Sequence, residues 1–150
     1  MANRADCYDK AIELLARRPH FREELASKLL MRGFPHAEID DAMARVDREG
    51  HLDDRRNALN LASGSMRRKS FGPRRIRADL ERRGVAPETV SLVLDEVFPD
   101  RESEVASARA AVERQRFSDE VDRVKVARHL ERKGYSAGVI LQLLEELEIH

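Results

Sequence analysis

Apolar residues recur at helical spacing along the chain, in a pattern that appears three times. Segments 25–34, 76–85 and 126–135 each open on an apolar residue, carry a leucine four positions later and reach a glycine after four more. Residues four apart share one face of an α-helix, so the spacing indicates helix and not strand. Each segment therefore predicts a helix that ends at its glycine.

The three glycines carry the same neighbours. Gly33, Gly84 and Gly134 lie 51 and 50 residues apart, and each follows a cation and precedes an apolar residue. Glycine accepts the left-handed backbone that commonly closes a helix, and a cation is favourable near the negative end of the helix dipole. The motif predicts a helix end followed by a tight turn.

A second helix is predicted after each turn. Apolar residues stand six, ten and thirteen positions beyond the glycine in all three copies, again at helical spacing. Pro35 and Pro87 suit the first position of the new helix, and Ser136 suits its N-cap.

A leading helix completes each unit. The segments 7–17, 54–69 and 102–116 have apolar residues on one side, and Gly64 weakens the second of them, which leaves room for a kink or a break. Because almost nothing alternates with a period of two, we expect no β-sheet.

These patterns predict an all-α protein of three tandem three-helix repeats, forming an elongated, curved array. The repeats are expected to span residues 1–52, 53–99 and 100–150. A unit of this size has a small core and gains stability from its neighbours, as stacked repeats do.

Composition narrows the class of protein. Among the 150 residues, 37% are charged, against a typical ~25%, and there is one cysteine, Cys7. No apolar run approaches the roughly 20 residues that cross a bilayer. The amino-terminal residues lack the basic-then-apolar pattern of a signal peptide. We expect a cytoplasmic protein with no membrane association.

A net charge of zero conceals an uneven distribution. Residues 67–83 hold eight basic and two acidic side chains, whereas residues 84–104 hold one basic and six acidic side chains. Overall neutrality therefore does not exclude a polyanionic partner.

The sequence offers no recognisable catalytic or metal-binding set. Its seven glycines are isolated, so there is no phosphate loop, and its histidines share no ligand spacing with Cys7 or with one another. We predict no catalytic residue, no metal, no cofactor and no small-molecule substrate, and therefore a binding protein and not an enzyme.

The basic segment is the best candidate site. Its candidate partner-binding residues are Arg67, Arg68, Lys69, Arg74, Arg75, Arg77 and Arg82. The alternative is a solvated helix with the ion pairs Arg75–Asp79, Arg77–Glu81 and Asp79–Arg83. Two acids cannot neutralise eight bases, however, and an uncompensated basic cluster is the footprint of a protein that binds phosphate or an acidic protein surface.

Two other functions remain open at this stage. Three helices with a turn also suggest a stand-alone, helix-turn-helix-like DNA-binding protein. The third helix of each repeat would then enter the major groove, yet segments 87–98 and 136–149 carry acids and no base. Any contact with nucleic acid should therefore be non-specific and use the first and second helices. The other alternative is a plain helical scaffold.

Three runs resemble the RecX family, bacterial regulators of the RecA recombinase: AIELLARRPHFREELASKLLMRGFP, REGHLDDRR and FGPRRIRADLERRGV. The similarity extends over about residues 8–148. It implies a fold of three tandem three-helix repeats. It also implies binding to RecA, especially to its filament on single-stranded DNA. The implied effect is modulation, usually inhibition of ATP hydrolysis, recombination and coprotease activity, without enzymatic activity. Phe21 and Asn57 depart from the family, which usually has serine and phenylalanine there.

Overall fold

The computed structural model describes residues 6–117 and 122–147, which form nine α-helices and no strand, confirming the all-α prediction. The helices are α1 (Cys7–Arg17), α2 (Arg22–Met31), α3 (His36–Arg48), α4 (Asp54–Lys69), α5 (Pro73–Arg82), α6 (Pro87–Val97), α7 (Arg101–Gln115), α8 (Arg123–Lys133) and α9 (Ala137–Glu146). Over this described part, no helix combines the length and apolar character needed to cross a membrane.

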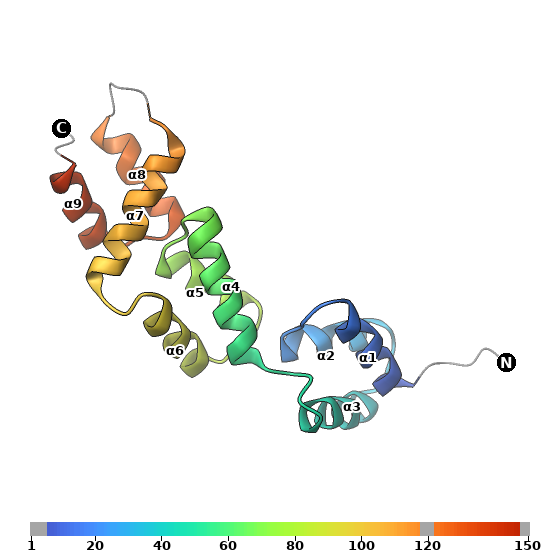
Figure 1. The fold of residues 1–150 in the computed structure, drawn as a ribbon. Coiled ribbons are helices and arrows are strands. Elements are labelled where there is room, and N and C mark those ends of the chain that lie inside the picture. Colours follow the sequence, from blue (N-terminus) through green and yellow to red (C-terminus); the bar gives the residue numbers. More distant parts are fainter. Residues whose placement is uncertain (1–5, 118–121, 148–150) are drawn as a thin grey trace.

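The helices pack in consecutive triplets. The main contacts between helices stay within α1–α3, α4–α6 and α7–α9, which we call modules one, two and three. Figure 1 shows the modules following one another in an elongated, curved array, with α1 and α9 at opposite ends. The tandem arrangement expected from the periodicity is therefore present.

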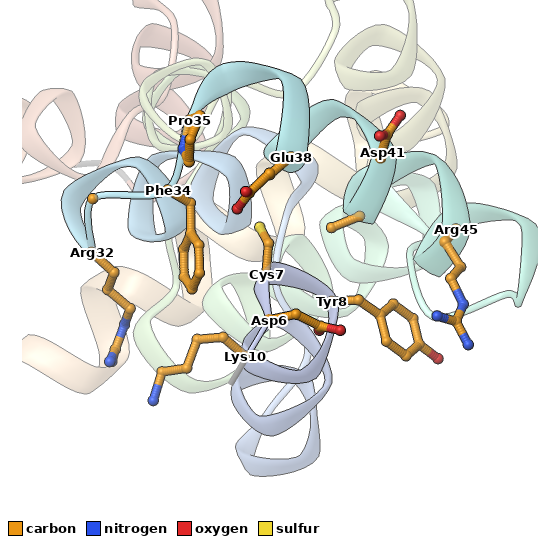
Figure 2. Close-up of a pocket in the computed structure, with 12 residues that line it drawn as sticks. Asp6, Cys7, Tyr8, Lys10, Arg32, Phe34, Pro35, Glu38, Asp41 and Arg45 are labelled. Carbon is orange, nitrogen blue, oxygen red and sulfur yellow. The ribbon is translucent and has the colours of Figure 1, made fainter. Parts of the chain in front are cut away.

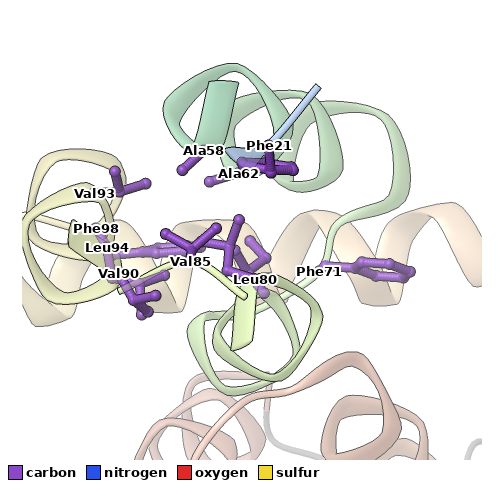
Figure 3. Close-up of a cluster of buried hydrophobic side chains, with 11 residues drawn as sticks. Phe21, Ala58, Ala62, Phe71, Leu80, Val85, Val90, Val93, Leu94 and Phe98 are labelled. Carbon is purple, nitrogen blue, oxygen red and sulfur yellow. The ribbon is translucent and has the colours of Figure 1, made fainter. Parts of the chain in front are cut away.

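Each module has its own buried cluster of apolar side chains, and the cluster of module two also takes in an apolar side chain from module one. The cluster of module one includes Leu25 and Val46, and that of module three includes Val126 and Leu143. The cluster of module two is built from α4–α6 but also contains Phe21, which comes from the α1–α2 loop of module one (Figure 3). Phe21 is only 5% exposed, so module one fills part of the core of module two.

The helix ends follow the repeat motif. Gly33, Gly84 and Gly134 have φ angles of +89°, +79° and +102°, the left-handed conformation predicted for them. Pro87 opens α6, and the Ser136 hydroxyl caps α9 by accepting a hydrogen bond from the Val139 amide. Pro35 is the N-cap of α3 and not its first residue, a shift of one position.

Helix α4 runs without interruption through Gly64, so of the two outcomes allowed there, a kink or a break, the break does not occur. Gly64 is buried, and the guanidinium of Arg68 occupies the space that a Cβ atom would take. Residues four apart lie on the same face of a helix, so Arg68 covers the backbone that glycine leaves open. The cost of one glycine, about 1 kcal/mol, is insufficient to break a packed helix of 16 residues.

Modules one and two meet through loops and helix ends. The Asn57 side-chain amide donates to the His20 carbonyl oxygen at 3.0 Å, and the Arg22 amide donates to the Asp54 carboxylate at 2.9 Å. Phe21 lies between these two contacts in the sequence. Phe21 and Asn57, which both depart from the resembled family, therefore lie at the same join.

Candidate functional site

The basic segment folds as the end of one helix and the start of the next. Helix α4 ends at Lys69, and Ser70 closes it in the left-handed conformation with φ of +54°. Gly72 is the N-cap of α5 and Pro73 its first residue. The chain thus reverses within a few residues, and this α4–α5 turn faces module three.

Module three binds the carbonyl oxygens at the end of α4. The Lys133 ammonium donates to the carbonyl oxygen of Lys69 at 2.9 Å, and the Tyr135 hydroxyl donates to that of Ser70 at 2.7 Å. The Arg114 guanidinium donates to the two preceding carbonyl oxygens, those of Arg67 and Arg68. Helix ends leave such oxygens without partners, and cations are favoured beside them.

The start of α5 completes the join. The Gly72 amide donates to the Lys133 carbonyl oxygen at 2.7 Å, and the Arg74 amide donates to that of Gly134 at 3.0 Å. A Cβ atom on Gly72 would lie 2.7 Å from the Gly134 oxygen, which is too close. The Phe-Gly-Pro run therefore serves to connect modules two and three.

All seven predicted partner-binding side chains are exposed, but they do not all stand free. Arg82 forms an ion pair with Asp79. The Arg75 guanidinium lies 3.8 Å from the centre of the Phe71 ring and donates to the Arg132 carbonyl oxygen at 3.3 Å. Cation–aromatic contacts hold a charge in place without neutralising it.

The remaining basic side chains have no acidic partner. Within residues 6–117 and 122–147, no ion pair involves Arg67, Arg68, Lys69, Arg74, Arg75 or Arg77. The alternative ion pairs of the sequence analysis do not form, and Asp79 pairs with Arg82 instead. Six of the seven candidate residues thus keep an uncompensated charge at the surface.

Three further cations join this surface from module three. Arg114 comes from α7, and Arg132 and Lys133 come from the end of α8. Burial, followed by the nearby charges of Arg75, Arg114 and Lys69, lowers the pKa of Lys133, which reports a strongly positive environment. The repeat motif marked Lys133 as a helix-end cation, but nothing in the sequence placed it or Arg114 beside the basic segment.

Tyr135 fixes the join from inside. Its hydroxyl lies 2.6 Å from the Ser107 hydroxyl oxygen and is bonded to Ser70, and its side chain is 1% exposed. Burial raises the pKa of Tyr135 to about 12, so the phenol stays protonated and keeps donating. The join between modules two and three therefore contains a buried, hydrogen-bonded phenol.

Module one contains a separate pocket of about 890 Å³ (Figure 2). Three acidic and three basic side chains line it, and Cys7 lies in its wall. Burial, and then the charges of Glu38 and Asp6, raise the pKa of Cys7, which disfavours the nucleophilic thiolate. In the part of the chain that the structure describes, no three histidine, cysteine or acidic side chains gather as metal ligands.

The third helices keep the acidic character that the sequence predicted. Helix α6 presents Glu88, Asp95 and Glu96 to solvent and contains no basic residue. In α9, Glu146 is bonded to Arg109 of α7 at 2.7 Å. Phosphate groups would be repelled by α6, so this surface does not suit the reading of a DNA major groove.

Comparison with known families assigns most of modules one and two. Residues 7–45 match the family domain described as RecX, first three-helix domain, and residues 53–94 match RecX, second three-helix domain. Together these matches cover more than half of the chain.

Whole-chain relatives agree with the domain matches. The regulatory protein RecX of Trichlorobacter lovleyi is 36% identical over 148 residues, covering 95% of this chain and 96% of the relative. That of Thermus thermophilus is 39% identical over 132 residues, covering 88% and 85%. The crystal structure of RecX from Lactobacillus salivarius superposes with a TM-score of 0.80 over 95% of this chain and 94% of that one, at 20% identity, and shares its fold.

Proposed function

This chain belongs to the RecX family of regulatory proteins, and we propose that it binds the RecA recombinase and mostly inhibits it. The form bound is the filament on single-stranded DNA, and the activities inhibited are ATP hydrolysis, recombination and the coprotease function. The protein acts in the cytoplasm and catalyses no reaction itself.

The observation that carries the proposal is the uncompensated basic surface of module two. Six exposed cations without described acidic partners create a positive potential at this surface, which attracts an anionic partner. A nucleoprotein filament offers phosphates and acidic side chains, and both attract arginine.

The shape of the molecule supports a filament as the partner. Three modules in a curved array present a long surface instead of one compact face (Figure 1). Modules spanning residues 1–52, 53–99 and 100–150 would contact successive subunits or lie along the filament groove. The acidic surface of α6 disfavours the alternative, a stand-alone DNA reader.

The test measures ATP hydrolysis by RecA on single-stranded DNA while the protein is titrated. The variant Arg74→Glu, Arg77→Glu reverses two exposed charges whose side chains have no described ion-pair partner, and it leaves Arg75 on Phe71. We expect the half-inhibitory concentration to rise at least about tenfold, as for the loss of charged contacts in an interface.

The matched control is Arg55→Glu, Arg56→Glu, which changes the same charge at the opposite end of α4. It should leave inhibition nearly unchanged, and both variants should keep the helical circular dichroism signal. Undiminished inhibition by Arg74→Glu, Arg77→Glu would refute the assigned surface, and no inhibition by the wild type would refute the function.

A further inference from the structure

A groove of about 570 Å³ lies where modules two and three join. Its walls come from the end of α4, the α4–α5 turn and α5 in module two, and from α7 and α8 in module three. Five cations line it: Arg68, Lys69, Arg75, Arg114 and Lys133. Among the residues that the structure describes, no carboxylate lines it.

These cations are held in place by groups that do not cancel their charge. Lys133 is bonded to the Lys69 carbonyl oxygen, and Arg114 to those of Arg67 and Arg68. Around the Phe71 ring, the charged groups of Arg75, Lys133 and Lys69 lie at 3.8, 5.3 and 5.4 Å from its centre. The positive charge is thus fixed before any ligand arrives.

The carbonyl groups that bind the cations do not neutralise the groove. The ends of α4 and α8 both point here, and each helix end contributes about half a negative charge. Five full positive charges exceed the two helix ends together. An anion with more than one negative charge would therefore be bound favourably.

We propose that this groove binds the phosphodiester backbone of nucleic acid. Consecutive phosphates bring several charges close together, as the five cations require. Phe71 is 7% exposed and covered by cations, so it offers no stacking surface, and contact would be to the backbone without base preference. Its role on the filament rests on the proposed function, but the binding itself does not need the recombinase.

The test uses a fluorescently labelled 20-nucleotide oligo-dT and the full-length protein, without RecA, and follows binding by fluorescence anisotropy. The variant is Arg114→Gln, Lys133→Gln, which removes two groove charges and none of the seven residues assigned to the recombinase surface. The control is Lys125→Gln, Arg128→Gln, which removes two exposed charges of α8 outside the groove.

We expect the groove variant to bind about tenfold more weakly, as charged hydrogen bonds to phosphate are lost. The slope of log affinity against log salt should become shallower by about 0.7 for each lost phosphate contact. The control should change little, and oligo-dA should bind as oligo-dT does. Unlabelled single-stranded DNA and unlabelled duplex DNA are then added as competitors, to show which form of nucleic acid supplies the phosphates. Displacement of the labelled oligo-dT by either competitor supports the proposal.

Three results would overturn it: no binding by the wild type, equal weakening in the two variants, or unchanged oligonucleotide binding by the groove variant. Unchanged binding with lost RecA inhibition would assign the groove to a protein surface. Where the double variant is less than fully folded by thermal unfolding, Lys133→Gln alone is compared with Lys125→Gln. Oligonucleotide binding without any RecA inhibition would sustain this inference and refute only the proposed function.

Discussion

At the residue scale, His20 shows how a single buried side chain depends on its protonation state. Its Nδ1 lies 2.9 Å from the Arg18 carbonyl oxygen and its Nε2 lies 2.8 Å from the Lys28 ammonium. An ammonium can only donate, so Nε2 accepts and Nδ1 carries the proton. The neutral ring satisfies both partners, whereas a protonated ring would turn an N–H toward Lys28.

This geometry predicts that stability falls on mild acidification. Burial, and then the charges of Arg18 and Lys28, lower the pKa of His20 from its ordinary 6.5, while the hydrogen bond to the Arg18 carbonyl oxygen and the charge of Glu24 act in the opposite direction. Around this pH the folded protein binds fewer protons than the unfolded chain. The contribution of His20 to the free energy of unfolding is therefore fully present above pH 6.5 and is lost as the pH falls through the lowered pKa. Urea unfolding at pH 7.5, 6.5 and 5.5 measures this loss.

The His20→Asn variant should show a flatter dependence over the same range, because its amide can donate to Arg18 but does not titrate. His129 contributes a loss of the same sign, since burial lowers its pKa too. A wild-type free energy of unfolding that rises between pH 6.5 and 5.5 would contradict the assignment.

At the element scale, the sequence predicts the helix ends better than it predicts the continuity of a helix. The glycine turns, the Ser136 cap and the helices before and after them follow from local backbone chemistry, so periodicity and turn residues were sufficient. The continuity of α4 at Gly64 could not be predicted, because the cost of a glycine is local, whereas the packing that holds α4 together is tertiary.

The candidate site was predictable only in part, for a related reason. The exposed charges of Arg74 and Arg77 could be placed from the helical period of α5 alone. Arg114 and Lys133 reach the same surface through contacts 46 and 64 residues away in sequence, with Arg68 and Lys69. No local pattern encodes such contacts, so the module-three side of the groove was invisible to sequence reasoning.

Two equivalent glycines test the role of the join. Gly33 and Gly134 both have positive φ. A Cβ atom on Gly33 would meet nothing within 4 Å, whereas a Cβ atom on Gly134 would lie 2.5 Å from the backbone nitrogen of Arg75. Gly33→Ala should lower the free energy of unfolding by about 1 kcal/mol through backbone strain alone. Gly134→Ala adds a backbone clash and should cost about 3 kcal/mol or more. Equal costs in urea unfolding would show that the close approach is unimportant.

At the scale of the whole molecule, Phe21 links the first two modules. It is carried by module one and buried in the core of module two, so removing it should affect both stability and shape. We expect Phe21→Ala to cost about 3 kcal/mol, as for other buried phenylalanines. We also expect a larger radius of gyration in small-angle scattering, because module one loses its anchor.

Phe98→Ala supplies the comparison, since Phe98 belongs to the same core but comes from module two itself. It should lower stability by a similar amount without changing the radius of gyration. Identical scattering from the two variants would mean that Phe21 contributes to stability but does not position module one.

Over the described residues, the modules meet through loops and helix ends and not through broad helix faces. Bending stress applied to such a molecule concentrates at its two narrow joints, while each bundle keeps its internal packing. Modules one and two are joined by the buried Phe21 ring and by the hydrogen bonds of Arg22 and Asn57, whereas the α4–α5 turn is bonded to module three by a larger set of hydrogen bonds. We therefore expect the array to bend more easily between modules one and two than between modules two and three.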